Sequence, residues 1–376
     1  MLGISLALLL AAAGGDLLTR GKQALERGDL AAAEAIYLRY VAENPRSAEG
    51  LSNLAAVLAR RERFQEAVAN YRKALRLAPQ LTQIYFNLAV AQLRSGDYGQ
   101  AIASLDRFLK AHPNEPRARH LLGIALVETG DRKRAIAELE KVYAAQPNDV
   151  SVLFALAGAH LRGGDLDRGK RLYAVLENLP QARAQVYLLG GLLHYRAREY
   201  AEAEQKFRQA LDLEPLSAPA LAAMGRLRLR VNDDEAAIGY FRKALELAPQ
   251  DAESTYQLGV LADRNGRTGE ARTLLKKAIA LRAGYPDPMY AMAKIELREK
   301  NTKAALALLE EAVRYAPEQE AIHLLLARAC QAAGLTTRAQ AEFAEVRRLQ
   351  QARLKRRQAD LEPEIALEPD PPSSPR

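Results

Sequence analysis

The side chains that could do chemistry in this 376-residue chain are five histidines, one cysteine and 46 carboxylates. Two imidazoles on neighbouring helices can bind a metal, and His160 and His194 are 34 residues apart, but no third ligand is evident beside them. The sequence has no HExxH or CxxC motif and no glycine-rich phosphate loop between a strand and a helix. The carboxylates form no pair that differs from ordinary solvated helix faces. We therefore predict a protein that is not an enzyme, with no catalytic, cofactor-binding or metal-binding residue.

The cysteine count and the charge exclude some classes of protein and leave others open. Cys330 is the only cysteine, so no disulfide can form within the chain, and we expect a small buried apolar side chain there. The net charge of +8 is compatible with an acidic partner, nucleic acid or a membrane surface. The basic residues are scattered along the whole chain, which favours an ordinary solvated surface.

Residues 48–81 show which elements must position the remaining polar and aromatic side chains. Apolar residues at Leu51, Leu54, Ala55 and Leu58 have helical spacing. A polar break over residues 60–63 follows, and then a second helical face begins, at Phe64, Ala67, Val68, Tyr71, Ala74 and Leu75. Pro79 lies just past the end of this face, where a residue without an N–H can stop a helix. The stretch is a helical hairpin with one apolar side, so it needs neighbours to bury that side.

The neighbours recur along the chain at a period of 34 residues. The small residue at Ala67 returns as Ala33, Ala101, Ala135, Ala203, Ala237, Ala271, Ala305 and Ala339. The proline at Pro79 returns as Pro45, Pro113, Pro147, Pro215, Pro249 and Pro317. A fixed period of this length is typical of a solenoid, and abundant Ala and Leu favour helices throughout.

The chain resembles the tetratricopeptide repeat (TPR) family in this period, in the small residue where the two helices meet and in the proline after the second helix. The resemblance covers ten repeats over residues 14–353. It implies an all-α fold, a right-handed superhelical solenoid of antiparallel helix pairs. We call the first helix of each repeat helix A and the second helix B.

Two features of the backbone remain open to interpretation. A glycine recurs at the turn between helices A and B, but four repeats have Glu62, Arg198, Asn232 or Lys300 there. Asn tolerates the left-handed conformation, so we expect a different turn geometry at the other three. The glycines at positions 163, 164, 169, 190 and 191 either let the array bend there or let helices pack closely.

The two ends of the chain differ from the repeats. Residues 1–13 are apolar and too short to span a bilayer, so they are either a secretory signal peptide or an apolar segment that packs on the first repeat. If the segment is cleaved, the protein is exported or periplasmic, without a membrane span in the mature chain. Otherwise it is cytoplasmic. Residues 354–376 form a basic helix end and then, from Asp360, a Pro-rich acidic tail that we expect to be disordered.

The resemblance also implies where a ligand would bind. In TPR proteins helix A lines the concave surface, and its second, fifth, sixth, ninth, twelfth and thirteenth positions are the ones that contact ligand. Aromatic and amide side chains at these positions could hold a peptide, and a ladder of arginines could bind carboxylates or simply cap helix ends. The candidate groove residues are Asn53, Arg60, Phe86, Asn87, Arg94, Phe154, Arg162, Tyr195, Arg196, Tyr256, Arg264, Tyr290 and Arg298.

These observations predict a protein–protein interaction scaffold whose partner is an acidic and apolar peptide or protein. An exported protein of this type would fit bacterial cell-envelope assembly or secretion. One alternative is a basic helical repeat that binds nucleic acid, which we expect less because no aromatic–basic alternation follows the repeats. Another alternative is a solenoid that regulates an enzyme encoded elsewhere.

Overall fold

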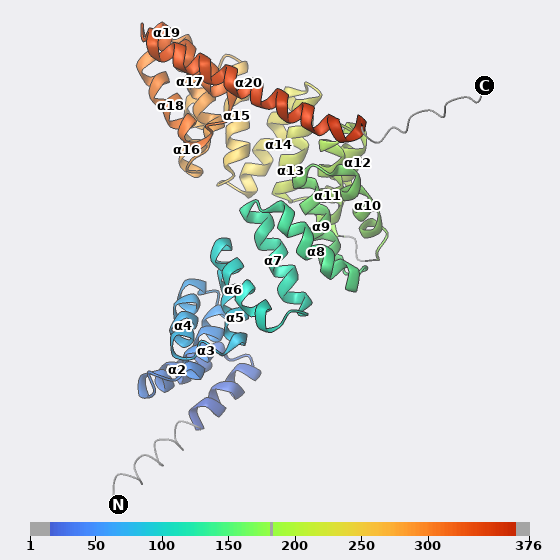
Figure 1. Ribbon diagram of the computed structural model, residues 1–376, viewed down its shortest axis with the longest axis vertical. Helices are drawn as coiled ribbons and strands as arrows, with labels where there is room; N and C mark the ends of the chain where they lie inside the picture. The colour runs from blue at the N-terminus through green and yellow to red at the C-terminus, as the bar shows by residue number, and fades with distance from the viewer. Residues whose placement is uncertain (1–15, 181–182, 366–376) are drawn as a thin grey trace, which may run out of the picture. The chain divides into compact units, whose positions relative to one another are not determined.

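The computed structural model describes residues 16–180 and 183–365, with side chains described as far as Lys355. Within these residues every regular element is a helix (Figure 1). A helix over residues 16–26 comes first. The others are α2 (Leu30–Glu43), α3 (Ala48–Arg60), α4 (Phe64–Leu77), α5 (Thr82–Arg94), α6 (Tyr98–Ala111), α7 (Pro116–Thr129), α8 (Arg132–Ala145), α9 (Val150–Gly163), α10 (Leu166–Glu177), α11 (Ala184–Arg196), α12 (Tyr200–Leu213), α13 (Ala218–Arg230), α14 (Asp234–Leu247), α15 (Ala252–Arg264), α16 (Thr268–Leu281), α17 (Pro286–Arg298), α18 (Thr302–Tyr315), α19 (Glu320–Ala332) and α20 (Thr336–Ile365).

The helices form the ten successive pairs that the 34-residue period predicts, with helix A at odd-numbered labels from α3 to α19. Most A helices pack on their own helix B, as α3 packs on α4, and most B helices also contact the next helix A, as α4 contacts α5. The predicted all-α array of helix pairs is therefore confirmed. Cys330, on α19, is fully buried as expected, and burial raises the pKa of its thiol.

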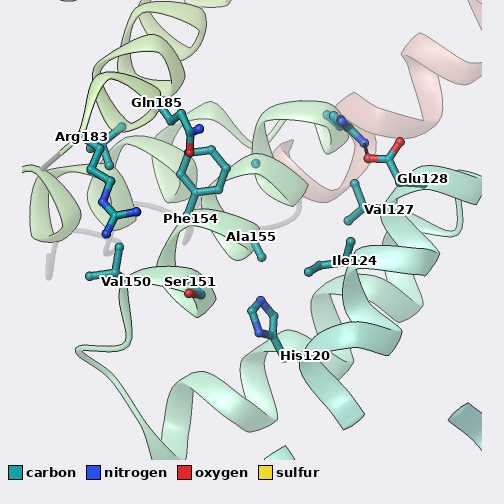
Figure 2. A pocket seen from close by; sticks show the side chains of 13 residues that line it. His120, Ile124, Val127, Glu128, Val150, Ser151, Phe154, Ala155, Arg183 and Gln185 are labelled. Carbon is teal, nitrogen blue, oxygen red and sulfur yellow. Dashed lines mark hydrogen bonds and ion pairs between the residues drawn. The ribbon is translucent and has the colours of Figure 1, made fainter. Parts of the chain in front are cut away.

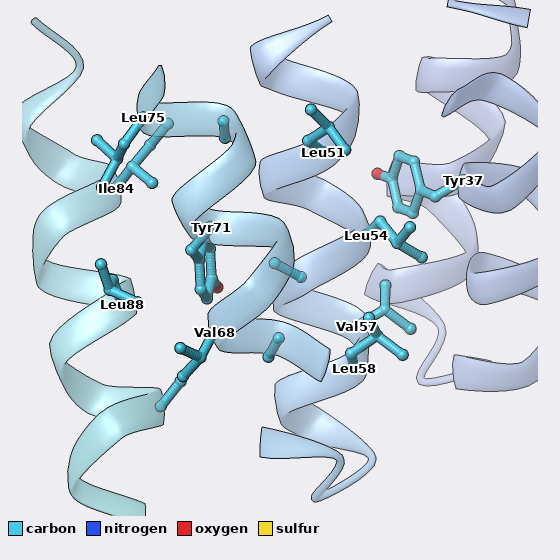
Figure 3. Packing of buried hydrophobic residues seen from close by; sticks show 14 of the residues in the cluster. Tyr37, Leu51, Leu54, Val57, Leu58, Val68, Tyr71, Leu75, Ile84 and Leu88 are labelled. Atoms are coloured by element: carbon cyan, nitrogen blue, oxygen red, sulfur yellow. The ribbon is translucent and has the colours of Figure 1, made fainter. Parts of the chain in front are cut away.

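The chain divides into two compact units, Met1–Lys206 and Phe207–Arg376, which we call the N-terminal and C-terminal units. Both have the same kind of core. Figure 3 shows Tyr37, Leu54 and Tyr71 buried between helices of the N-terminal unit. In the C-terminal unit Phe241 and Leu275 occupy the position of Tyr71 in their repeats and have no exposed surface. Burying one such side chain contributes about 2 kcal/mol, and the period repeats this contribution along the array.

The turn between helices A and B contains a residue with positive φ in every repeat. Glu62, Arg198, Asn232 and Lys300 have φ of 60°, 65°, 58° and 63°, close to Gly96 at 79°. The expectation that Glu62, Arg198 and Lys300 would use a different turn was wrong. The reason is hydrogen bonding: Glu62 N donates to Ala59 O at 3.1 Å and the next N–H donates to Leu58 O at 2.9 Å. These bonds close the end of helix A and outweigh the cost of a left-handed residue, about 1 kcal/mol.

Gly169 and Gly190, two of the five glycines that the sequence left open to interpretation, allow helices to pack closely. A Cβ on Gly190 would run into the ring of Tyr173, and one on Gly169 would lie 2.7 Å from Leu193 Cδ2. Both contacts are too close for a side chain, so α10 and α11 approach through their glycines. Gly164, in contrast, has φ of 89° and ends α9. The structure thus supports close helix packing at Gly169 and Gly190.

The ends of the chain are described only in part. Residues 1–13, the predicted signal peptide, lie outside the described residues. α20 continues to Ile365, so the helix extends past Asp360, where the sequence predicted the disordered tail to begin. Residues from 366 onward lie outside the described part. None of the described helices is long and apolar enough to cross a membrane.

Candidate functional site

We call the surface formed by the A helices of a unit its A-helix face. In the N-terminal unit this face contains a pocket of about 580 Å³ (Figure 2). Three successive A helices, α7, α9 and α11, supply its walls. Most of the lining residues stand at the second, fifth, sixth, ninth, twelfth and thirteenth positions of their repeats. They are His120, Ile124, Val127, Glu128, Val150, Ser151, Phe154, Ala155, Gly158, Arg162, Arg183, Gln185 and Val186.

Local sequence fixes the helices that carry these side chains. α7 begins with Pro116, whose missing N–H is not needed in the first turn, and ends at Gly130, with φ of 88°. α9 begins at an N-cap, Asp149, whose carboxylate accepts from Ser151 N at 2.8 Å and from Val152 N at 3.1 Å. Arg183 precedes α11 in an extended conformation and makes no side-chain cap bond. A guanidinium has no acceptor atom, so it cannot cap the N-terminus of α11.

The pocket wall is mainly apolar and rests on a fully buried layer. Ile124, Val127 and Val150 are partly exposed on the wall, while Leu153 and Leu156 of α9 belong to the core and have no exposed surface. Phe154 is the largest apolar side chain of the wall and is 37% exposed. A large exposed ring beside an open cavity is the kind of surface that a ligand would cover.

His120 supplies a polar atom to this apolar wall. Its Nε2 is buried and has no hydrogen-bond partner among the described residues. Burial lowers the pKa of His120 from its usual value of 6.5, although Asp149 and the backbone of Ser151 act in the opposite direction. The ring is therefore neutral at pH 7. A neutral imidazole with an unpaired buried nitrogen is an unmet hydrogen-bonding group.

The two arginines at the rim differ in whether they have an ion-pair partner. Arg162 donates to Glu128 at 2.7 Å across two neighbouring A helices, so these two charges balance each other. Arg183 is exposed and makes no hydrogen bond or ion pair with any side chain that the structure describes. Arg183 thus brings to the rim a guanidinium without an ion-pair partner among the described residues.

The structure places the other predicted groove residues of the N-terminal unit on A helices outside the pocket. Asn53 and Asn87 are half-buried, and their amides make no hydrogen bond within the described chain. Phe86 is half-buried against Phe108, with ring centroids 5.2 Å apart. Tyr195 lies 6.0 Å from the ring of Tyr200. Among the predicted groove arginines of this unit, Arg60, Arg94 and Arg196 are exposed and form no ion pair with the described residues.

In the C-terminal unit the predicted groove residues contact other side chains of the same unit. Arg264 pairs with Asp234 at 3.2 Å, and Arg298 makes two bonds with the carboxylate of Asp263. Lys294 lies over the ring of Tyr290, 6.0 Å from its centroid.

Tyr256, the remaining predicted residue of this unit, packs against the buried Tyr285 with ring centroids 5.5 Å apart. Burial and the nearby Asp287 raise the pKa of Tyr256 to about 12. Its hydroxyl therefore stays protonated at neutral pH.

His160 and His194 have different surroundings. His194 Nδ1 lies 2.6 Å from Glu199 Oε2, within hydrogen-bond reach. His160 is buried, and neither of its ring nitrogens forms a hydrogen bond within the described chain. Across residues 16–180 and 183–365, no cluster of three or more His, Cys, Asp or Glu side chains could hold a metal.

Several residues of the pocket were not among the predicted contacts. Ser151, Gln185, Ile124 and Gly158 stand at second and ninth positions, so the positional rule could have named them, although their residue types attract no attention. Arg183 precedes α11, so it is at none of the helix A positions that are expected to contact ligand. It lines the pocket because α11, which it precedes, contacts α9.

Comparison with known proteins agrees with this architecture. Tetratricopeptide repeat models match residues 86–150, 120–182, 154–218, 188–252 and 222–286, and two further models of the same description match residues 46–111 and 296–361. No curated protein matches the sequence significantly.

Solved structures of low sequence identity share the fold. The crystal structure of the APC/C hetero-tetramer Cut9–Hcn1 is similar over 79% of this chain, with 21% identity and a TM-score of 0.57, and the match spans 58% of that chain. A tetratricopeptide repeat protein from Parabacteroides merdae is similar over 71% of this chain and 99% of its own, with 18% identity and a TM-score of 0.56. Repeats of this kind form scaffolds that bind proteins or peptides and are typically non-catalytic. The chain belongs to the tetratricopeptide repeat family.

Proposed function

We propose that the protein is a non-catalytic scaffold that binds an extended segment of a partner protein on its A-helix face, with the pocket over α7, α9 and α11 as the main contact. The observation that carries this proposal is the pocket itself. Its volume of about 580 Å³ is typical of ligand sites, and its wall is apolar and open. Covering the exposed part of Phe154 and its neighbours would stabilise a complex.

The polar groups along the same face favour a peptide that is partly acidic. The free amides of Asn53 and Asn87 can each bond a peptide backbone without reading its sequence. The exposed side chains of Arg60, Arg94 and Arg196 can bind carboxylates in bidentate fashion. A partner with alternating apolar and acidic residues would satisfy both sets.

The test is selection of peptides on the full chain. A displayed library of random 16-residue peptides is bound to the immobilised protein, and the enriched peptides are labelled and measured by fluorescence anisotropy. Hydrogen exchange then maps each peptide. We expect new protection on α7, α9 and α11 but not on α8 and α10. Failure to enrich any peptide on the folded protein, or protection confined to B helices, would contradict the proposal.

Binding to nucleic acid is the outcome that would replace it. Protein that shifts DNA or RNA in a strongly salt-dependent way, and that enriches no peptide, would be a basic nucleic-acid-binding repeat.

The cellular context is a separate proposal that rests on the sequence alone. The apolar run that ends in Ala11, Ala12 and Ala13 motivates cleavage, export and a role in assembly or secretion at a bacterial envelope. N-terminal sequencing of the mature protein tests it. A mature chain that begins near Gly14 supports export, and an intact Met1 contradicts it.

A further inference from the structure

The pocket over α7, α9 and α11 offers three different chemistries at separate places. Phe154 and Ile124 belong to the apolar wall, His120 places an unpaired ring nitrogen on one side, and Arg183 stands at the rim near Val150 (Figure 2). An occupant that matches the pocket must therefore be apolar in bulk, must hydrogen-bond in the interior and must be negative at the edge. These three requirements together specify the ligand more narrowly than the shape does.

The interior requirement comes from the buried Nε2 of His120. Because the ring is neutral, this nitrogen is a donor in one tautomer and an acceptor in the other. A hydroxyl group satisfies both cases, since an O–H donates and its oxygen accepts. A purely apolar group would leave the nitrogen unpaired.

The edge requirement comes from the balance of charges. Glu128 is already bound to Arg162 at 2.7 Å, so it does not neutralise Arg183. A carboxylate beside the apolar side chain of the ligand can pair with Arg183 in bidentate geometry. A lysine or arginine at the same place in the partner would be repelled.

We infer that this pocket is an anchor site for a tyrosine side chain that has an aspartate or glutamate next to it in an extended partner segment. The aromatic ring covers Phe154 and Ile124, the phenol hydroxyl bonds to His120 Nε2, and the neighbouring carboxylate pairs with Arg183. The inference rests on the proposed function, because it names the segment that the same face would hold.

The experiment uses the full chain and the peptides that the random library enriches. Each enriched peptide with a tyrosine beside an acidic residue is compared with two derivatives, one with Tyr changed to Phe and one with the acidic residue changed to its amide. The protein variants are His120→Phe, which keeps an aromatic ring, and Arg183→Gln. Arg171→Gln is the matched control, because Arg171 is exposed on α10, a B helix. Thermal unfolding checks that each variant is folded.

We expect the Tyr peptide to bind the wild-type protein about fivefold to tenfold more tightly than the Phe peptide, the range of one added hydrogen bond. His120→Phe should remove this preference, Arg183→Gln should remove the preference for the acidic residue, and Arg171→Gln should change neither. Enriched peptides that lack tyrosine, or Tyr and Phe peptides of equal affinity for the wild type, would overturn the inference and leave the scaffold proposal standing. If no peptide binds, both are overturned. The comparison of Tyr and Phe peptides needs no protein variant, so it holds even if a variant fails to fold.

Discussion

The N-terminal and C-terminal units share a core and differ on their A-helix faces. At the thirteenth repeat position, Arg60, Arg94 and Arg196 of the N-terminal unit are exposed and form no ion pair with described residues. In the C-terminal unit Arg264 and Arg298 are bound to Asp234 and Asp263. Three of the four arginines at this position in the N-terminal unit are therefore open to a ligand, and the fourth, Arg162, pairs with Glu128. Arg264 and Arg298 of the C-terminal unit are both engaged within the chain.

The aromatic residues follow the same division. Phe154 of the N-terminal unit borders an open pocket, whereas Tyr256 of the C-terminal unit packs on Tyr285 and is partly buried. A repeat position therefore shows where a side chain points, but it does not show whether that side chain already has a partner within the chain.

The largest expected effect is in the shared core. Gly190→Ala in the N-terminal unit and Gly225→Ala in the C-terminal unit would each push a Cβ into an aromatic ring, that of Tyr173 or Phe241. We expect each to lower the free energy of unfolding by about 2–3 kcal/mol, as overpacked cores do, measured by urea denaturation. Gly239→Ala, on α14 with nothing within 4 Å of its Cβ, is the control and should raise it by up to about 1 kcal/mol. An unchanged stability for Gly190→Ala would show that α10 and α11 do not pack closely.

The next effect distinguishes two buried carboxylates. Glu296 of the C-terminal unit is bound by Arg272 and Asn301, and Glu34 of the N-terminal unit is bound by Arg61 and Arg63. Arg272→Gln should cost about 1–2 kcal/mol because Glu296 loses the guanidinium that is hydrogen-bonded to it. Arg63→Gln should have a smaller effect because Arg61 remains.

The pH dependence gives the Glu296 prediction a second readout. Burial raises the pKa of Glu296, but its bonds with Arg272 and Asn301 outweigh this, so the pKa is lowered from 4.5. A lowered carboxylate pKa stabilises the fold above pH 4.5, and this contribution is lost as the pH falls through the folded-state pKa. Arg272→Gln should therefore reduce the loss of stability of the wild type below pH 4.5. A variant with the same acid profile as the wild type would contradict this account.

A smaller effect separates two histidines. His120 of the N-terminal unit leaves Nε2 unpaired, while His323 of the C-terminal unit is within reach of Glu342 at 2.7 Å and of Pro317 O at 2.9 Å. Because burial lowers the pKa of His120, the unfolded chain takes up this proton more readily than the folded one below pH 6.5. Stability should therefore fall as the pH drops from 6.5, and His120→Phe should make that fall smaller. The control is His112→Gln, at an exposed position, and a pH profile unaffected by His120→Phe would be evidence against the buried neutral ring.

The smallest effect concerns the arginine ladder. Arg298→Gln breaks an exposed ion pair with Asp263, so it should cost about 0.5 kcal/mol at low salt and less at high salt. Arg60→Gln breaks no ion pair of the described chain, so thermal unfolding should show no change. A larger effect at Arg60 than at Arg298 would reverse the contrast between the units.

The sequence was sufficient for the fold because the 34-residue period places small and bulky residues in register, as Ala67 and Tyr71 show. It failed at Glu62, Arg198 and Lys300, where hydrogen bonds at the end of helix A impose a left-handed residue whatever its type. For the candidate site, the period predicted that Phe154 and Arg162 lie on one face. It could not predict the pairing of Arg162 with Glu128 or the approach of Arg183, because both depend on distances between helices.

The central claim, that partners bind in the pocket over α7, α9 and α11, is tested most directly by filling the pocket. Gly158 lies on its wall with nothing within 4 Å of a Cβ, so the leucine of Gly158→Leu occupies part of the pocket without removing a contact. Gly239→Leu adds the same side chain to α14 of the C-terminal unit, where there is also nothing within 4 Å. Affinity for the enriched peptides is measured by fluorescence anisotropy on both folded variants. We predict that Gly158→Leu weakens binding at least about tenfold, about 1.4 kcal/mol, and that Gly239→Leu leaves it unchanged. Equal affinity of the Gly158→Leu variant and the wild-type protein would contradict the claim.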